Sequence, residues 1–547
     1  MIAKRSKIMY NPRYTLKKRG DGMGKKRRWA ALFCLTALLL GLAGCAGTGK
    51  AASQQPSRQE AAEEEPGRRI VIATMSEPPS LSPTGHSSVA GDYMNLLTYS
   101  TLFRLDMEMT PQPHLVEEYQ AVSSTLWRFC LRDGVHFHDG TPLTALDVKA
   151  SLERARTFPQ VSRYTDCIQK VRVVDRLCFE IETRRPSACL INDLCIHANS
   201  ILPKHLIDSG NDFSKNPIGS GPYRFCTWVL GDRLEFEAFS DYFLGEPPIT
   251  HMVWRIIPRG EERTAALENG EVDFLMDVEN THCQRLKQCS GIQVTEFLST
   301  GPTWLMLNNQ HPALSNLWVR RAVSAAIDRE RVIQEALGGL GEAAVGQAPF
   351  NLPGYTEENA QGYDPQLARE YLGRSGVDAQ EIQLSIICSS DTKRRAAQVI
   401  VRDLAAIGIA AQVESMDLAT YLAATTQGHY SAAIGGYAAS TMLGYMTAVF
   451  HSGSIGSTNK TFLRSGELDR LIDQAQVTTD RQQRIGILRQ ACALANSLCT
   501  QAPLYQPVEL RAYREGLQGV EIAPSGKLYF ESLSWAGQTG TPRPPSA

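Results

Sequence analysis

The segment 127–154, WRFCLRDGVHFHDGTPLTALDVKASLER, constrains the fold more than any other part of the chain. Its large apolar residues alternate with polar or small ones, first over residues 127–131 and then over residues 135–137. A period of two is typical of strands with one buried face. The segment therefore predicts two half-buried strands, joined by the first of its two Asp-Gly turns.

A helix is expected directly after the second Asp-Gly pair. Thr144 followed three residues later by Asp147 is the pattern of an N-cap with an acidic N3 residue. Val148 and Leu152 then lie one helical turn apart and form one apolar stripe.

The N-terminus resembles a bacterial lipoprotein signal. Residues 25–28 are basic, and the apolar run over residues 30–44 is shorter than the roughly 20 residues that span a bilayer. The run ends in Leu-Ala-Gly-Cys, so residues 1–45 are predicted to be a signal peptide with a lipobox and Cys45 to be lipidated. Met23 precedes the basic cluster, so translation starts either at Met1 or at Met23.

Residues 46–67 are rich in Ala, Gly, Gln, Ser and Glu without apolar periodicity, which predicts a flexible tether. Of the 56 basic and 57 acidic residues, 11 basic ones and one acidic one precede Cys45, so the rest of the chain has a net charge of −11. This negative charge argues against a nucleic-acid partner. The remaining length exceeds a single ordinary core, and strand and helix signals interleave, so we predict an α/β protein of two or three lobes.

Two further elements are expected near the start of the domain: a strand over residues 69–74 and a helix over residues 93–103. The 13 cysteines contain no C-x-x-C pattern, which leaves zinc-ribbon and thioredoxin interpretations without support. Cys283 with Cys289, and Cys492 with Cys499, are candidate pairs. Most other cysteines are expected to be buried small apolar residues.

Several segments together resemble one family, the family 5 extracellular solute-binding proteins, which are the peptide and nickel receptors of ABC importers. The segment described first resembles the family's R-D-G-V-x-F-x-D-G turn, which leads into T-A-x-D-V and a helix. Other resemblances follow in the family's order: EPPSLSP at 77–83, NPIGSGPYRF at 216–225, TAALENGEVD at 264–273, VRRA through AIDR at 319–329, and GELDRLI at 466–472.

The resemblance implies a bilobal, type II periplasmic-binding-protein fold (cluster C) with an extra inserted domain. Lobe I would comprise residues 68–100, 205–298 and 512–537. The inserted domain would be 101–204 and lobe III 299–511. Ligand would bind in the cleft between lobes I and III, which closes by a hinge.

The resemblance also implies which residues line that cleft. Peptide-binding members use a segment G-W-x-A-D, whose Asp pairs with the peptide's ammonium, but residues 436–440 here read G-Y-A-A-S. Losing this charge-assisted hydrogen bond costs roughly 1.5–3 kcal/mol, which disfavours ordinary free-amine peptides. The expected ligand-binding residues are Glu77, Tyr223, Trp304, Tyr437 and Ser440.

A nickel chelate is the alternative ligand within the same family. Residues 445–453 resemble the corresponding segment of nickel receptors, and imidazole suits Ni²⁺. His86, His429 and His451 are the candidate ligands, with any metal as cargo. His136 and His138 also have metal-compatible spacing, but the family uses their turn structurally, and we favour that role.

Motifs of catalysis are missing from the sequence: it contains neither G-x-S-x-G nor H-E-x-x-H, so an enzyme is not expected. The family implies no cofactor, ABC permease and ATPase partners, a monomer, and an extracytoplasmic location anchored through Cys45. A ligand-sensing or chaperone-like lipoprotein without transport is the alternative function.

Overall fold

The computed structural model describes residues 68–86 and 88–537. The predicted signal peptide, the lipidated Cys45 and the tether lie outside these residues. Within the described part of the chain, no helix is both long and apolar enough to span a membrane.

A 12-stranded sheet is the backbone of this part of the protein. Its strands in spatial order are β16 (Ala410–Ser415), β15 (Gln383–Cys388), β17 (Ala432–Gly436), β13 (Thr303–Leu307), β18 (Gln501–Arg514), β11 (Phe274–Leu275), β1 (Arg69–Thr74), β10 (His251–Ile256), β9 (Arg233–Ala238) and β8 (Tyr223–Val229). Two further strands, β12 (Ile292–Leu298) and β14 (Gly341–Ala343), also pair with β18.

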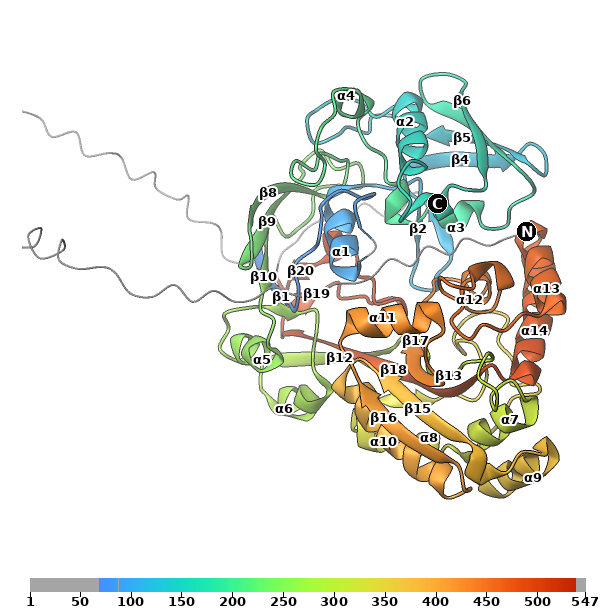
Figure 1. Ribbon diagram of the computed structural model, residues 1–547. Coiled ribbons are helices and arrows are strands. Elements are labelled where there is room, and N and C mark those ends of the chain that lie inside the picture. The colour runs from blue at the N-terminus through green and yellow to red at the C-terminus, as the bar shows by residue number, and fades with distance from the viewer. Residues whose placement is uncertain (1–67, 87, 538–547) are drawn as a thin grey trace, which may run out of the picture. The chain divides into compact units, whose positions relative to one another are not determined.

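Strand β18 belongs to both halves of this sheet (Figure 1). Its first residues pair with β13, whereas the stretch from Val508 to Arg514 pairs with β12. The chain crosses between the halves again where β12 ends and β13 begins. We call β1 and β8–β12 the lobe I strands, and β13–β17 the lobe III strands.

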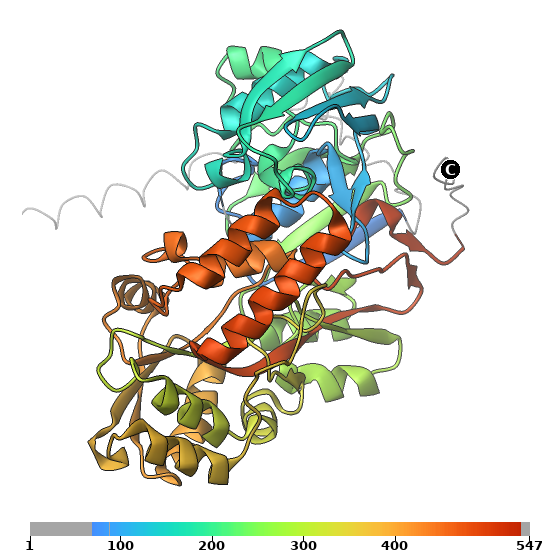
Figure 2. The same ribbon diagram turned by 90° about the vertical axis from the view of Figure 1, so that its right-hand side faces the viewer.

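Helices accompany both sets of strands. Near the lobe I strands lie α1 (Val89–Thr98), α5 (Gly260–Glu268), α6 (Cys283–Gln288), η3 (Asn280–His282), η6 (Phe530–Ser532) and the small ladder of β19 (Leu517–Gln518) with β20 (Ser534–Trp535). The lobe III strands are followed or preceded by α7 (Leu317–Ala326), α8 (Arg329–Leu337), α9 (Pro365–Ser375), η4 (Ala379–Glu381), α10 (Asp391–Ala405), α11 (Leu418–Gln427), α12 (Met442–Val449), η5 (Ser452–Ser454), α13 (Gly466–Val477) and α14 (Arg481–Leu498). Figure 2 shows α13 and α14 packed side by side.

Burial explains why the lobe III helices pack on their strands. Leu305, Ile386 and Ile434 come from three neighbouring strands and are fully buried in one core with Val323 of α7 and Ile400 of α10. Completely burying such side chains contributes about 1.5–3 kcal/mol each.

The segment between β1 and β8 contains a second sheet, of four strands. Its elements are β2 (Phe103–Leu105), β3 (Pro111–Pro113), β4 (Val116–Ala121), β5 (Leu126–Leu131), α2 (Ala145–Ala155), η1 (Ser162–Tyr164), β6 (Ile168–Val173), β7 (Cys178–Thr183), α3 (Leu190–Asp193), η2 (His197–Asn199) and α4 (Lys204–Asp208). The strand order is β4-β5-β7-β6, and Val148 and Leu152 of α2 pack against Phe129 and Phe179 in its core.

The structure confirms several of the predicted elements. The first strand is β1, residues 126–131 form β5, and Thr144 with Asp147 forms the capping box of α2.

Two predicted elements were wrong. Residues 135–137 do not form a regular strand: the chain turns back over residues 137–140, so these residues only make an isolated antiparallel bridge, between His136 and Pro142. The helix predicted over residues 93–103 runs instead over Val89–Thr98: Ser88 caps its start, and Tyr99 is already extended.

The candidate cysteine pairs are not formed in the structure, where Cys283, Cys289, Cys492 and Cys499 have free thiols. A disulfide instead joins Cys130 and Cys178, which are paired residues on neighbouring strands with Cα atoms 4.2 Å apart. Pairing across a sheet places distant residues side by side, and spacing along the chain does not reveal it.

His138 connects the two most family-like segments of the sequence. Its backbone N–H donates to the carbonyl of Gly219 at 2.8 Å, and its Nε2 lies 3.0 Å from the carbonyl of Gly221. Its Nδ1 accepts from the Gly219 amide at 3.4 Å. A Cβ at Gly219 would lie 2.2 Å from the carbonyl oxygen of Thr98, so only glycine allows this close approach to the end of α1. These hydrogen bonds therefore support the structural role that we favoured for the turn around His138.

Replacing His138 by glutamine should flatten the pH dependence of stability. Burial lowers the pKa of His138 to about 4, against the opposing effect of the hydrogen bond with Gly221. Between about pH 6.5 and pH 4 the unfolded chain binds a proton that the folded chain does not, so stability falls as the pH drops through this window. We expect His138→Gln to melt lower than wild type at pH 7.5 but to lose less stability between pH 6.5 and 4.5.

Thermal unfolding followed by circular dichroism in buffers of constant ionic strength measures this difference. His429→Gln, on an exposed loop, is the control and should keep the wild-type melting temperature at pH 7.5. If the melting temperatures of wild type and His138→Gln fell in parallel as the pH drops, His138 would not cause the pH dependence of stability.

Candidate functional site

Glu77 lies in the proline-rich loop that follows β1. Its Oε2 accepts hydrogen bonds from Trp228 Nε1 and from the Gly231 amide, both at 3.1 Å. The carboxylate therefore fastens the loop to the β8–β9 hairpin. One oxygen of Glu77 is committed to the protein's own donors, which makes this residue a support of the loop.

Trp304 and Tyr437 lie on paired lobe III elements. Trp304 pairs with Gly435 across the antiparallel strands β13 and β17, and Tyr437 directly follows the last residue of β17. Trp304 is 4% exposed and packs edge-on against Tyr445, with ring centroids 5.9 Å apart. Tyr437, half-buried, contacts the same Tyr445 at 6.4 Å. These three rings form one aromatic cluster, and within the described residues the Trp304 Nε1 is a buried donor without an acceptor.

Ser440 follows Tyr437 by three residues and is half-buried. The next residue, Thr441, caps α12 by accepting from the Gly444 amide. Tyr437 and Ser440 therefore occupy one short segment between β17 and α12, next to the aromatic cluster.

Arg163 of η1, in the segment between β1 and β8, lies near Tyr437. The sequence did not predict this neighbour. Its guanidinium stacks 4.6 Å above the Tyr164 ring, donates to that hydroxyl at 2.7 Å and interacts electrostatically with Tyr437. Within the described chain Arg163 forms no ion pair and is exposed. The Arg-Tyr dipeptide in a loop was its only sequence signal.

Tyr223 does not lie with the other predicted ligand-binding residues. It is fully buried in the lobe I core, where its hydroxyl donates to the Phe530 carbonyl at 3.4 Å. Burial raises the pKa of this hydroxyl well above its ordinary value. Tyr223 supports the fold in this conformation, because it opens β8 facing the core.

The three candidate metal ligands do not converge. His451 caps η5 through Nδ1, and its Nε2 lies 3.4 Å from Asp473. His429 is exposed on the loop after α11. His86 is buried against α1 of lobe I, where its neighbours are Asp92 and His197.

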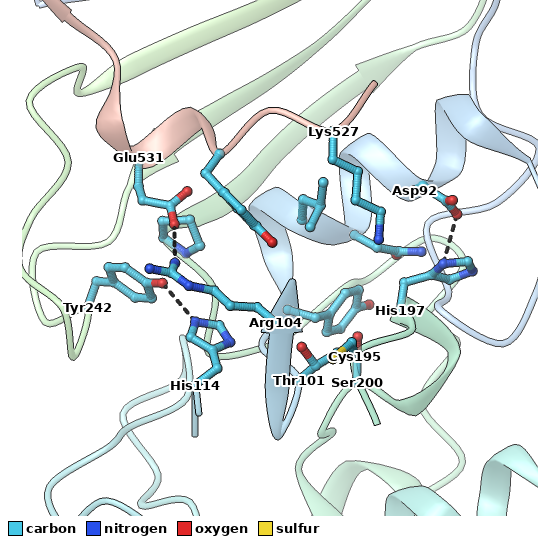
Figure 3. Close-up of a pocket in the computed structure, with 15 residues that line it drawn as sticks. Asp92, Thr101, Arg104, His114, Cys195, His197, Ser200, Tyr242, Lys527 and Glu531 are labelled. Atoms are coloured by element: carbon cyan, nitrogen blue, oxygen red, sulfur yellow. Dashed lines mark hydrogen bonds and ion pairs between the residues drawn. The ribbon is translucent and has the colours of Figure 1, made fainter. Parts of the chain in front are cut away.

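A cavity of about 540 Å³, counting its opening to solvent, lies beside Asp92 and His197 (Figure 3). Arg104 and Glu531 form an ion pair at 3.0 Å in its wall, and His114 Nε2 lies 3.3 Å from the Tyr242 hydroxyl. Burial raises the pKa of Glu531 even though Arg104 opposes the shift. The residues around the cavity come from α1, β2, η2 and the segment 527–531, a combination that only the tertiary structure reveals.

The family model described as "Bacterial extracellular solute-binding proteins, family 5 Middle" matches residues 110–457. The chain belongs to this family. Its members are substrate-binding proteins of ABC importers and are not enzymes, which confirms both predictions.

Named relatives and solved structures resemble the chain over nearly its whole described length. "Glutathione-binding protein GsiB" of Salmonella typhi is 27% identical over 479 residues, which are 84% of this chain and 93% of the relative. The same protein of Escherichia coli O1:K1 / APEC is 27% identical over 481 residues, which are 85% of this chain and 94% of the relative.

Among solved structures, CtaP of Listeria monocytogenes has a TM-score of 0.78 at 21% identity and covers 86% of this chain and 99% of that one. NikZ of Campylobacter jejuni in complex with Ni(L-His) has a TM-score of 0.74 at 21% identity. The match covers 86% of this chain and 100% of NikZ. These likenesses confirm the predicted α/β periplasmic-binding-protein fold.

Removing the Glu77 carboxylate should loosen the proline-rich loop. Glu77→Ala deletes the acceptor of two hydrogen bonds, one of them from a backbone amide, and we expect a local loss of about 1 kcal/mol. Hydrogen exchange followed by mass spectrometry should show faster exchange for residues 75–82 and 228–231.

Glu235→Ala is the matched control, because Glu235 lies on the adjacent β9 and pairs only with Arg233 in the described chain. It should leave exchange in the loop unchanged. Equal loosening in both variants would show that Glu77 is not the fastening residue.

Proposed function

We propose that this protein is a lipid-anchored receptor on the extracytoplasmic face of a bacterial membrane. It captures a small ligand between lobes I and III and delivers it to an ABC permease. Near-complete coverage of the relatives supports this proposal, as does the pair of strand crossings at β12–β13 and β18, where a hinge would bend. The residue ranges predicted for lobe I, the inserted domain and lobe III, the lipid on Cys45 and the monomeric state form part of the proposal.

The ligand we propose is a small peptide, modified peptide or metal chelate that carries carboxylates. The charges near Tyr437 carry this choice: Ser440 offers no carboxylate for an ammonium group, whereas Arg163 offers an exposed guanidinium without an ion-pair partner in the described chain. A guanidinium group binds a carboxylate in a bidentate geometry, with two parallel hydrogen bonds. Trp304, Tyr437 and Tyr445 supply an apolar wall beside these groups.

Two of the relatives support this ligand class. One is named a glutathione-binding protein, and the solved NikZ holds Ni(L-His). Glutathione is a modified tripeptide with two carboxylates and one ammonium group, so it carries one carboxylate more than tri-alanine. Histidine likewise brings a carboxylate to its nickel complex, so Arg163 would serve either ligand.

Isothermal titration of the full-length chain in detergent with glutathione, with tri-alanine and with Ni²⁺ plus L-histidine tests the ligand class. We expect glutathione or the chelate to bind more tightly than tri-alanine, and Arg163→Gln to weaken that binding about tenfold. Arg172→Gln is the control, because Arg172 lies in the same domain and pairs with Glu182 at 2.9 Å. Tighter binding of tri-alanine, unaffected by Arg163→Gln, would overturn the proposed ligand class.

Restoring an acid at position 440 should create affinity for free-amine peptides. Ser440→Asp supplies the carboxylate that an ammonium group needs, and we expect tri-alanine to bind roughly 10- to 100-fold more tightly. Ser457→Asp adds the same charge on an exposed turn of lobe III and should have no such effect. An equal response in both variants would show that position 440 does not face the ligand.

The alternative function, ligand sensing or chaperone-like binding without transport, shares these binding predictions. Uptake of the identified ligand by cells with and without the gene separates the two functions. Unchanged uptake in cells without the gene would favour the alternative.

A further inference from the structure

A histidine–carboxylate cluster outside the proposed ligand site has the composition of a metal centre. His86 ends the proline-rich loop, Asp92 lies in the first turn of α1, and His197 opens η2. Each can present one ligand atom, and the three atoms lie within 4.8 Å of one another. His197 is far along the chain from the other two, so the cluster joins lobe I to the inserted segment.

One carboxylate oxygen lies between the two imidazoles. His197 Nδ1 is 2.9 Å from Asp92 Oδ1, and His86 Nδ1 is 3.9 Å from the same oxygen (the Asp92–His197 contact is drawn in Figure 3). Nitrogen and oxygen ligands of Zn²⁺ lie about 2.0–2.2 Å from the metal, so ligand atoms in one site stand about 3–3.5 Å apart. The two separations bracket that value, and small side-chain rotations would bring the three atoms around one cation.

The side chain of His86 is fully buried, and Asp92 and His197 are its neighbours within the cluster.

The packing around His86 leaves space for its ring and no other side chain. A Cβ at Gly91 would lie 2.4 Å from the imidazole, so glycine at this position makes room for the ring. His86 and His197 stack with centroids 5.0 Å apart and an interplanar angle of 12°. A cation lies in the plane of each imidazole that binds it, so one ring would turn about χ2 when the metal enters.

At this cluster, Asp92 Oδ1, His197 Nε2 and Asn95 Oδ1 are among the buried polar atoms of the described chain that lack a hydrogen-bond partner. Asn95 Nδ2 lies 2.7 Å from His86 Nε2. If the amide turns over, its oxygen accepts the Nε2–H of His86 and leaves the lone pair on Nδ1, which here accepts from the Ser88 amide at 3.3 Å and would bind the metal in its place. Metal-binding histidines commonly donate their second N–H in this way.

We propose that His86, Asp92 and His197 form a binding site for a divalent transition metal such as Ni²⁺ or Zn²⁺. Two imidazoles and one carboxylate suit these ions and leave coordination positions for water. The metal would be a resident ion that ties the proline-rich loop and α1 to η2. The site is separate from the proposed ligand site, because neither Trp304, Tyr437 nor Arg163 lines the cavity beside it.

Lys527 provides an internal check on this assignment. It lines the same cavity as Asp92 and His197, and its ammonium opposes the binding of a cation there. Lys527→Met should therefore bind the metal several-fold more tightly than the wild-type chain.

Binding of metal alone to the full-length, tag-free chain in detergent tests the proposal. All samples carry Cys226→Ser, because Cys226 is the exposed free thiol of the described chain and thiolates bind these metals. After treatment with EDTA, equilibrium dialysis against NiCl₂ or ZnCl₂ without any amino acid, followed by metal analysis, gives stoichiometry and affinity. We expect one equivalent bound, and an affinity about 100-fold lower in His197→Gln.

His282→Gln is the matched control. Like His197, His282 has a 13%-exposed side chain and lies near a carboxylate, Glu261, at 3.0 Å, but it belongs to no three-residue cluster in the described chain. It should bind the metal with the same affinity as the parent protein, which carries Cys226→Ser alone. Asp92→Asn, which keeps the shape of the side chain, should also weaken metal binding. An unchanged melting temperature without metal would show that His197→Gln and Asp92→Asn are folded.

Co²⁺ gives a second readout. Its visible absorption in the parent protein should report nitrogen and oxygen ligands in a site of low coordination number, and His197→Gln should lose that spectrum. Binding of less than one equivalent, or equal losses in His197→Gln and His282→Gln, would overturn the proposal. Tyr437→Ala should leave metal binding intact, so failure of this proposal and failure of the proposed ligand class are distinguishable.

Discussion

The hydrogen bonds of His138 to the backbone at residues 219 and 221 hold three parts of the protein together. The turn that contains His138 belongs to the inserted segment, and the glycines lead into β8 of lobe I. The same glycines pack against the last turn of α1 so closely that a side chain would collide with it. Because the imidazole uses one nitrogen as donor and the other as acceptor, the joint needs the neutral ring, which burial favours.

The position of α1 then decides what both candidate sites can do. Its first turn carries Asp92, and the loop before it carries Glu77 and His86. Glu77 fastens that loop to the β8–β9 hairpin, and Asp92 reaches His197 of the inserted segment. On the other side, β12–β13 and β18 are the strand connections through which lobe III follows lobe I. Two sets of strands joined by two strand connections are compatible with the closing receptor that we propose.

The choice of ligand rests on charge rather than on shape. The aromatic cluster around Tyr445 would accept many apolar groups, and such contacts discriminate weakly. A charged group without its partner costs far more, so in the proposed ligand site Ser440 in place of the expected acid, together with the exposed Arg163, would favour ligands with additional carboxylates over ordinary peptides. This charge pattern links the chain to relatives with different named ligands through a chemical feature that those ligands share.

The sequence by itself determined the family, the α/β class, the capping box of α2 and the strands β1 and β5, because these depend on local patterns of burial, turns and caps. It also located Tyr437 and Ser440 on one short segment. The sequence missed the Cys130–Cys178 pair, the buried position of Tyr223, the position of Arg163 near Tyr437 and the stacking of His86 on His197. Each of these depends on residues that are distant in the chain, and only the pairing of strands and the docking of the inserted segment bring them together.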